Sequence, residues 1–310
     1  MISKRTQNLI SKNREILAKL QSLLDGYNSS LKPLMLEEME VNFLQWLGGL
    51  IDADGSFVVY WRTSSAWEVT ISIKMHLREF AALDKIQKRF KGRISQEENC
   101  YVWHLCAKED VKEFVIAING YVFLKSKDLN KVLSLYHLTL INGQFSLTSA
   151  WFSGFLEGDG FASVSKVIAV SIGLKLARFN KPVLTKLSQE IRVVYGISLK
   201  VRDSSCFDWR TNKRYYSSAI EFSRAHDLMF AFHYLLKHPF ASNKQFDVDF
   251  ALVCYKLWLL KPLLSKQDRR ALTSTIVVWN KNKGNPIKAC ALKPEIYDSL
   301  RAMLKKYASN

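Results

Sequence analysis

Two short segments of this sequence read alike, and their repetition constrains the fold more than any other feature. The segments are residues 46–57 and 151–161, and each is an apolar run that closes with an acidic residue, a small residue, an aspartate and a glycine. The closing aspartates, Asp54 and Asp159, are separated by the length of a small domain. A motif that recurs at this spacing predicts a duplicated chain with pseudo-two-fold symmetry.

A helical conformation explains the residue types in both segments. Residues three and four apart share a face of a helix, which places small residues on one stripe of each segment, namely Gly49 and Ala53 in the first and Gly154 and Gly158 in the second. Such stripes let two helix backbones approach closely. We therefore predict that the two helices pack together and bring their closing aspartates side by side.

The ends of these helices predict a cation site. Gly55 and Gly160 stand where a left-handed residue often stops a helix. The C-terminal end of a helix carries unpaired carbonyls and the negative pole of the helix dipole, so it favours cations. Two carboxylates crowded there would repel each other unless a hard cation such as Mg²⁺ lay between them. For a single copy, a helix-packing motif with capping acids is the simpler interpretation, and the recurrence of the whole ending weakens it.

These residues carry a family resemblance. Residues 47–55 resemble the signature of the LAGLIDADG homing endonucleases and differ from the family name only at Gly48. Residues 152–160 resemble the looser second copy found in the single-chain, two-motif members of that family. The resemblance extends over residues 40–262, which is most of the chain.

The segments after each motif predict the fold class. The hydrophobic period changes from that of a helix to the alternation of a strand, and each half reads as helix, two strands, helix, two strands and two helices. We predict an α+β fold of two pseudo-symmetric αββαββαα units, each a curved four-stranded antiparallel sheet backed by helices, joined by a two-helix interface. In the second half we expect a long polar loop over residues 204–214.

Four regions are expected along the chain. Residues 1–38 form an N-terminal helical extension, which either docks on the first domain or clasps DNA. Residues 39–147 form the first domain and residues 148–265 the second. Residues 266–310 form a basic C-terminal extension, either a solvated face or an auxiliary nucleic-acid contact.

The net charge of +17 predicts a polyanionic partner, with nucleic acid as the first candidate and an anionic membrane surface as the second. No segment combines transmembrane length with the absence of charge, so we expect no membrane partner. The five cysteines include no CxxC pair, which favours a reducing compartment over a disulfide framework or a zinc site. We expect an intracellular, organellar location, although the basic N-terminus is weak support for it.

The resemblance implies a metal-dependent catalytic site. Asp54 and Asp159 would hold Mg²⁺, or Ca²⁺ or Mn²⁺ in vitro, assisted by the main-chain carbonyls of Ala53 and Gly158. Each aspartate would serve one strand of a DNA duplex that lies across the pseudo-two-fold axis. In the family the cut crosses the minor groove and leaves staggered ends.

Further site residues are implied on either side of the aspartates. The family often places a lysine near the scissile phosphate in each half, and Lys127 and Lys244 occupy that place, although each also suits an ordinary surface lysine. Asp52 and Glu157 point elsewhere on a helix, so we interpret them as capping or inter-domain hydrogen-bond groups. The polar residue, often glutamine, that commonly ends the second strand of each half in the family is missing here.

Recognition of DNA is expected from the polar faces of the two sheets, where side chains reach base edges in the major groove and basic loops meet phosphates. The candidates in the first half are Tyr60, Arg62, Glu68, Thr70, Ser72 and Lys74. Those in the second half are Lys166, Ser171, Lys200, Arg202, Arg210, Lys213, Arg214 and Tyr216.

The resemblance therefore predicts a monomeric, intron-encoded, site-specific endonuclease that cuts double-stranded DNA at a long asymmetric target. Two alternatives stay open. The same fold serves in intron maturases that bind structured intron RNA, and in derivatives that bind DNA without cutting it. The intact pair Asp54 and Asp159 favours the endonuclease, because a protein that only binds has no use for two crowded carboxylates facing a phosphate backbone.

Overall fold

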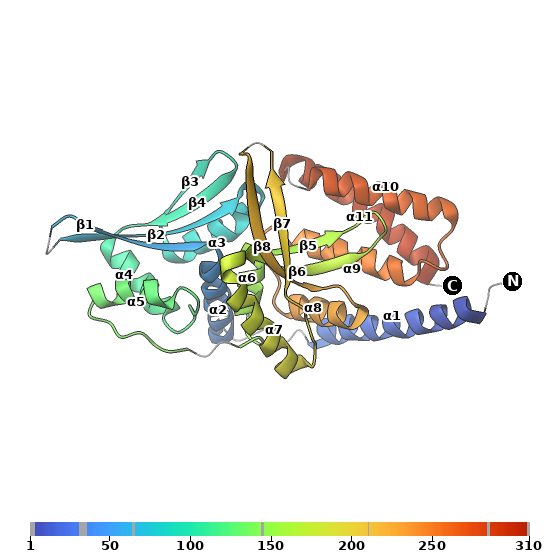
Figure 1. Ribbon diagram of the computed structural model, residues 1–310, viewed down its shortest axis with the longest axis horizontal. Coiled ribbons are helices and arrows are strands. Elements are labelled where there is room, and N and C mark those ends of the chain that lie inside the picture. The colour runs from blue at the N-terminus through green and yellow to red at the C-terminus, as the bar shows by residue number, and fades with distance from the viewer. Residues whose placement is uncertain are drawn as a thin grey trace.

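The computed structural model describes residues 4–30, 36–63, 66–143, 146–209, 211–283 and 286–308. Two four-stranded antiparallel sheets lie on either side of a central pair of helices, and further helices back each sheet (Figure 1). The predicted α+β class and the αββαββαα order of both halves are confirmed.

The first half begins with α2 (Leu36–Asp54), which runs directly into the first strand. Its sheet has the order β1-β2-β4-β3. The face of this sheet that packs on the helices contributes Ile71 and Trp103, both fully buried against Phe114 and its neighbours. The remaining elements are β1 (Gly55–Trp61), β2 (Trp67–His76), the short 3₁₀ helix η1 (Leu77–Glu79), α3 (Phe80–Phe90), β3 (Arg93–Glu97), β4 (Cys100–Leu105), α4 (Lys108–Ile118) and α5 (Ser126–Leu135).

The second half repeats this order. It begins with α6 (Trp151–Asp159), and its sheet has the order β5-β6-β8-β7. Ile172, Leu174 and Phe222 form part of its core. The remaining elements are β5 (Gly160–Val164), β6 (Val170–Ala177), the 3₁₀ helix η2 (Arg178–Asn180), α7 (Lys181–Tyr195), β7 (Arg202–Asp208), β8 (Lys213–Phe222), α8 (Ala225–Lys237) and α9 (Gln245–Leu259).

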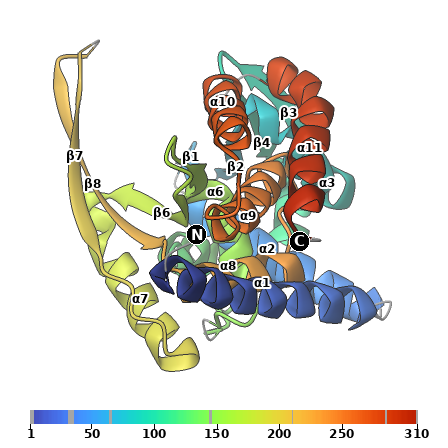
Figure 2. The ribbon, with the colours of Figure 1, turned by 90° about the vertical axis from the view of Figure 1, so that its right-hand side faces the viewer.

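The β7–β8 hairpin corrects the loop predicted over residues 204–214. Both strands pair in antiparallel register through Asp208 and Lys213, and Ser204 shares a 2.8 Å hydrogen bond with Ser217. The hairpin projects away from the rest of the chain (Figure 2), so most of its residues are exposed on both faces. A strand with no buried face has no apolar alternation, which is why the sequence pattern missed it.

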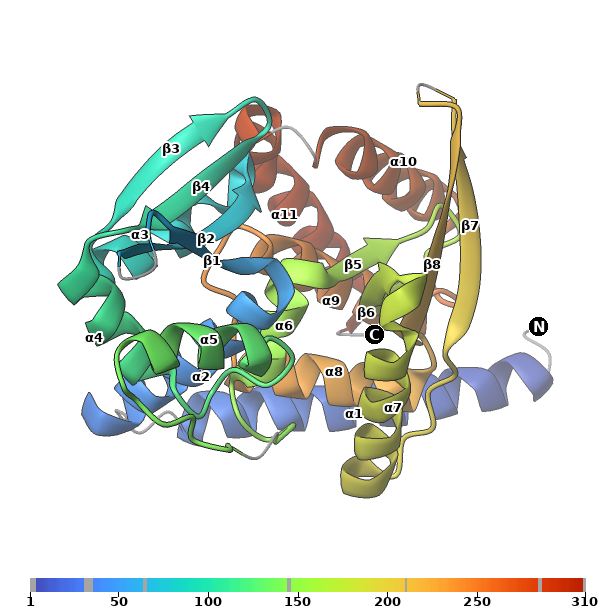
Figure 3. The ribbon, with the colours of Figure 1, turned by 60° about the vertical axis from the view of Figure 1, so that its left-hand side comes forward.

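The central helices pack as predicted from their small residues. A Cβ added to Gly49 would lie 1.9 Å from the carbonyl oxygen of Trp151, and one added to Gly154 would lie 1.8 Å from that of Trp46. No side chain fits at either position, because α2 and α6 meet backbone to backbone. The two helices therefore form the interface that joins the halves (Figure 3).

The glycines that follow the two aspartates differ from prediction. Among the described glycines only Gly92, Gly120 and Gly196 have a positive φ, and Gly160 is extended with a φ of −87°. A Cβ on Gly55 would lie 2.7 Å from the carbonyl oxygen of Ile51. Glycine is needed after each helix because the chain turns straight into a strand against the last helical turn, and the left-handed stop does not occur.

The N-terminal extension is a docked helix, but it docks on the second half and not on the first. Helix α1 (Lys4–Ser30) packs against α8 and α9. Leu20 is buried in the core of the second half, and the side-chain amide of Asn13 donates a 2.8 Å hydrogen bond to the carbonyl of Leu259. In the described part of the chain, no helix is both long and apolar enough to cross a bilayer.

The C-terminal extension forms two helices, α10 (Lys266–Asn282) and α11 (Pro286–Ala308), which pack on α9. The ring of Trp279 on α10 lies 4.6 Å from that of Phe246 and 5.3 Å from that of Phe250, centroid to centroid. Pro294 lies inside α11.

An ion pair ties the two halves together at one side of the central helices. Nη2 of Arg78, in η1, lies 2.8 Å from Oδ2 of Asp247 on α9, and Nη1 of the same arginine donates to the carbonyl of Lys283. The side chains of Arg78 and Asp247 are 17% and 4% exposed. This pair is therefore shielded from the water that weakens most surface pairs.

Replacing Arg78 with methionine should lower the free energy of unfolding by about 3 kcal/mol, because the substitution leaves the buried carboxylate of Asp247 without its cation. Urea denaturation measures the change. The matched control is Arg62→Met, which breaks the exposed pair between Arg62 and Glu68 and should cost much less, because water and salt screen that pair. Equal losses in the two variants would contradict the role given to the buried pair.

Candidate active site between the central helices

Asp54 and Asp159 end the two central helices and lie next to each other. The carboxylate of Asp54 crosses the interface, so a Cβ added to Gly158 would lie 2.8 Å from its Oδ2. The structure thus brings together the two aspartates that the repeated motif singled out. They lie where α2 and α6 pass into β1 and β5, between the two sheets (Figure 3).

The surroundings of this carboxylate pair disfavour its negative charge. Burial, reinforced by the charge of Asp159, raises the pKa of Asp54 to about 7. Burial also raises the pKa of Asp159. Glu79, a buried residue of η1 that the sequence patterns did not single out, adds a further negative charge near Asp54. A bound cation would relieve this repulsion.

The donor atoms suit a hard divalent cation, because they are all oxygens. Within the described ranges no group of three or more His, Cys, Asp or Glu side chains is placed to hold a metal. A cation at Asp54 and Asp159 would therefore complete its shell with main-chain carbonyls, water and phosphate oxygens.

A lysine lies beside each aspartate. Nζ of Lys244 donates to the carbonyls of Glu157 (2.7 Å) and Gly158 (3.1 Å). In the first half the corresponding contacts come from Lys125, whose Nζ donates to the carbonyls of Ile51 (3.0 Å), Ala53 (2.8 Å) and Gly55 (2.6 Å). Burial lowers the pKa of both lysines.

Lys125 corrects the residue assigned from the sequence. Lys127 is exposed on α5, whereas Lys125 precedes the first residue of α5 just as Lys244 precedes the first residue of α9. The match between Lys127 and Lys244 is therefore two residues out of register. The sequence offered two lysines on either side of Ser126, and their local pattern does not distinguish them.

Asp52 and Glu157 are the inter-domain hydrogen-bond groups that we predicted. Each accepts a bond from the tryptophan that begins the opposite motif, Trp151 Nε1 to Asp52 at 2.9 Å and Trp46 Nε1 to Glu157 at 2.7 Å. Each also binds backbone amides in the loop that carries the adjacent lysine: Phe123, Leu124 and Lys125 for Asp52, and Ala241 and Ser242 for Glu157. These buried acids therefore position the lysines as well as the helices.

The carbonyl of Ala53 accepts a hydrogen bond from the ammonium of Lys125, and that of Gly158 accepts one from Lys244. A carbonyl oxygen has two lone pairs, so one remains on each for a cation. Their assignment as metal ligands stays a prediction.

The open face of the first sheet carries most of the predicted recognition residues. Glu68, Thr70, Ser72 and Lys74 lie on one face of β2, and the buried residues between them lie on the other. Ser72 is paired with Ser56 on β1 and with His104 on β4. Tyr60 lies opposite Glu68. Two exposed ion pairs partly neutralise this face, Arg62 with Glu68 at 2.8 Å and Lys74 with Glu97 at 2.9 Å.

The strand register of the second sheet places the predicted DNA-recognition residues on both of its faces. Ser171, Arg202 and Lys213 share the open face, while Lys166 and Lys200 are exposed in the segments before β6 and β7. Arg214 and Tyr216 point to the opposite face, because successive residues of a strand alternate.

Two further basic residues lie at the second sheet, one on each side of it. The guanidinium of Arg178 lies 5.7 Å from the ring of Tyr216, on the helix side of the second sheet. Lys175, which was not among the predicted residues, lies exposed on the open face opposite Ala219. Arg210 lies outside the described residues.

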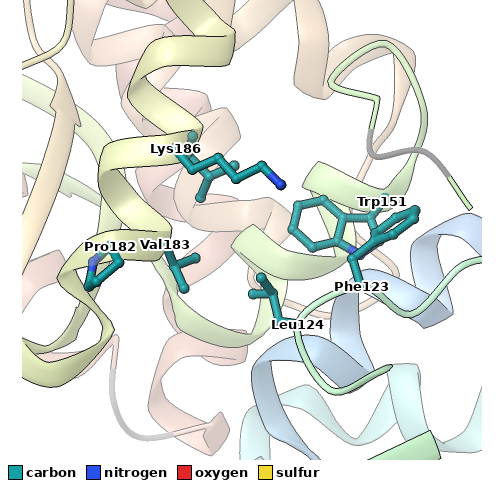
Figure 4. Close-up of a pocket in the computed structure, with 7 residues that line it drawn as sticks. Phe123, Leu124, Trp151, Pro182, Val183 and Lys186 are labelled. Atoms are coloured by element: carbon teal, nitrogen blue, oxygen red, sulfur yellow. The ribbon is translucent and has the colours of Figure 1, made fainter. Parts of the chain in front are cut away.

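A separate pocket contains no group suited to the chemistry of the aspartates. Its volume is about 240 Å³ and its lining is almost wholly apolar. Figure 4 shows Lys186 extending from α7 towards Trp151 across this pocket. Its full lining is Phe123, Leu124, Trp151, Pro182, Val183, Lys186 and Leu187.

Comparison with known proteins agrees with this geometry. Residues 47–133 match a family model described as LAGLIDADG endonuclease. The chain is 30% identical over 130 residues to the intron-encoded RNA maturase bI4 of Saccharomyces cerevisiae, a match that covers 40% of this chain and 20% of the maturase. It is 21% identical over 227 residues to the intron-encoded DNA endonuclease ai2b of Dictyostelium discoideum, covering 72% of this chain and 83% of that protein. The match thus spans about a fifth of the length of the maturase.

Two solved structures share the fold. The LAGLIDADG homing endonuclease I-GzeII, in complex with its DNA target, superposes with a TM-score of 0.55 at 15% identity over 76% of this chain and 97% of its own. I-LtrWI, also bound to target DNA, superposes with a TM-score of 0.54 at 14% identity over 77% and 98%.

Residues 47–133 of the present chain thus match the LAGLIDADG endonuclease model, and the chain shares the fold of solved LAGLIDADG homing endonucleases. Both motifs and both sheets occur in one polypeptide, an arrangement that fits the single-chain, two-motif type.

Proposed function

We propose that this protein is a site-specific DNA endonuclease that hydrolyses both strands of a long asymmetric duplex. The observation that carries the proposal is the pair Asp54 and Asp159, held together at the helix ends between two open sheet faces. The relatives I-GzeII and I-LtrWI, each bound to target DNA, and the ai2b DNA endonuclease support the choice of substrate.

The chemistry follows from what each group can do at a phosphodiester. Divalent cations, Mg²⁺ in the first instance, would activate water, neutralise charge at phosphorus and stabilise the leaving 3′ oxygen. Asp54 and Asp159 would hold them, each serving one strand. Lys125 and Lys244 would oppose the negative charge that develops on the phosphate. The curved open faces would set the register of the duplex across this site.

The oligomeric state and the cellular location are also part of the proposed function. We propose that the protein acts as a monomer, since one chain supplies both halves of the site. The intron-encoded relatives favour an intron-encoded protein, and we extend this to an organellar location.

A second function is favoured by one observation, the similarity to the bI4 RNA maturase. In that case the open faces would bind structured intron RNA, and cleavage of DNA would be secondary or absent.

The experiment that tests the proposal is cleavage of a library of long DNA duplexes, with and without Mg²⁺, read by sequencing the new ends. We expect Mg²⁺-dependent cuts with staggered ends at one asymmetric sequence. Tight binding to structured intron RNA without any cut in DNA would favour the maturase instead.

Replacing Lys125 with methionine should slow cleavage by about 10²-fold, because the substitution removes a buried positive charge near the phosphate. Single-turnover cleavage at saturating protein measures the loss. The matched control is Lys127→Met, which removes an exposed lysine two residues away and should leave the rate unchanged. A greater loss in the control would restore the original assignment of Lys127.

A further inference from the structure

Helix α10 lies beside the open edge of the second sheet. Strand β5 is the edge strand opposite β7, and two side chains from the end of α10 reach its free carbonyls. Asn280 Nδ2 donates to Val164 O at 2.8 Å, and Lys283 Nζ approaches Ala162 O at 3.4 Å. The second sheet therefore ends in β7 on one side, and α10 borders its other edge at β5.

The packing of α10 fixes which of its faces is free. Leu272, Ile276 and Trp279 are buried, and the ring of Trp279 packs on Phe246 and Phe250 of α9. Asn280 points to the edge of β5. Because a helix advances 3.6 residues per turn, Arg270, Ser274 and Lys281 fall on the side away from α9, next to the side that meets β5. All three are exposed.

The charge on this free side is of one sign. The single acidic residue of α10 is Asp268, which is directed towards α11, where it binds Lys306 at 2.8 Å and Tyr307. Arg270 and Lys281 are left with no acidic residue on their own face of α10. On α11, by contrast, exposed Glu295 and Asp298 accompany the basic residues. The exposed side of α10 is therefore purely basic, whereas the exposed side of α11 carries both signs of charge.

We propose that α10 is an additional DNA-contacting element, whose Arg270 and Lys281 bind phosphates of the half of the duplex that lies on the second sheet. This inference rests on the proposed function. Two features of α10 support it: the helix is continuous with the edge of the sheet, and its charge is complementary to a phosphate backbone.

If α10 binds DNA, the two halves of the protein make unequal numbers of phosphate contacts. In the first half, α5 is followed by the connection to α6, and in the described residues no helices corresponding to α10 and α11 follow it. The duplex would therefore meet more phosphate contacts on one side of the cleavage site than on the other. The protected length should be greater on the side of the second sheet.

The test compares the double variant Arg270→Glu/Lys281→Glu with the wild-type chain. The probe is a labelled duplex recovered from a DNA library by binding to the wild-type protein. We expect the Kd at physiological salt to rise at least about tenfold, and the slope of log Kd against log salt concentration to fall by about two, one for each lost phosphate contact. The neutral variant Arg270→Gln/Lys281→Gln should show the same loss of slope with a smaller loss of affinity.

The matched control is Lys112→Glu/Arg192→Glu, which makes the same change of charge on the exposed sides of α4 and α7, two helices that back the sheets. It should leave the slope unchanged. Trimming the duplex at the outer end of the second half-site should reduce the difference between wild type and the α10 variant, because Arg270 lies at the end of α10 that is remote from the first half. Trimming the other end of the duplex should preserve the difference.

The outcomes separate this inference from the proposed function. An α10 variant that binds with wild-type Kd and salt slope, or a control that loses as much, would overturn the inference while wild-type cleavage still supported the function. A wild-type chain that recovers no duplex and cuts none would overturn the proposed function itself. An α10 variant that loses affinity for structured RNA but keeps wild-type affinity for DNA would also overturn the inference.

Discussion

Asp54→Asn should abolish cleavage of the DNA target while leaving its affinity for that target intact. Asparagine has almost the shape of aspartate but lacks the charge that holds a divalent cation, so the transition state loses several kcal/mol of stabilisation. The expected loss is on the order of 10³-fold or more in the single-turnover rate. We expect affinity to persist, because in the proposed complex most of the duplex would lie against the two sheets and not against this carboxylate.

The rate and the Kd are to be measured on one duplex, the rate in Mg²⁺ and the Kd in Ca²⁺. The matched control is Asp128→Asn, which removes an exposed carboxylate on α5 that pairs with Lys131. This control should cut at the wild-type rate. Equal cutting by Asp54→Asn and wild type would remove the metal role assigned to Asp54.

Gly154→Ala should destabilise the protein by at least about 3 kcal/mol, because the added methyl group would lie 1.8 Å from the carbonyl oxygen of Trp46. The obstacle is backbone, which a rotamer change cannot move aside. The two central helices must separate, and the carboxylates at their ends separate with them. We therefore expect cleavage to fall together with stability.

Urea denaturation measures the loss, and the adjacent residue provides the control. Ser153 is buried on the same helix, and its hydroxyl has no hydrogen-bond partner among the described atoms. Ser153→Ala should therefore be neutral or slightly stabilising. If the two substitutions cost the same, close backbone approach at Gly154 is not what holds the halves together.

The recurrence of one motif was enough to predict most of the fold. Small residues at helical spacing predicted that α2 and α6 meet, and Gly49 and Gly154 do lie against the opposite backbone. Apolar alternation predicted strands wherever one face is buried. The outer part of the β7–β8 hairpin was taken as a loop, because it is exposed on both faces and leaves no such alternation in the sequence.

The site was predicted in part. The two aspartates follow from the motif, since their position at the helix ends is local. The lysines were harder, because Lys125 and Lys127 are chemically identical and two residues apart. What distinguishes them is the buried Asp52, whose carboxylate binds the backbone amide of Lys125 and so fixes the loop on the motif. That contact spans distant parts of the chain.

The sequence by itself determined the duplication, the order of elements and the carboxylate pair, because each is written in local spacing and residue type. Only the tertiary structure decided the rest: that α1 docks on the second half, that Lys125 approaches the first motif, that Arg78 pairs with Asp247, and that α10 covers the edge of β5. These contacts join residues far apart in the chain. Their partners are selected by burial and by unsatisfied polar groups, neither of which exists until the chain has folded.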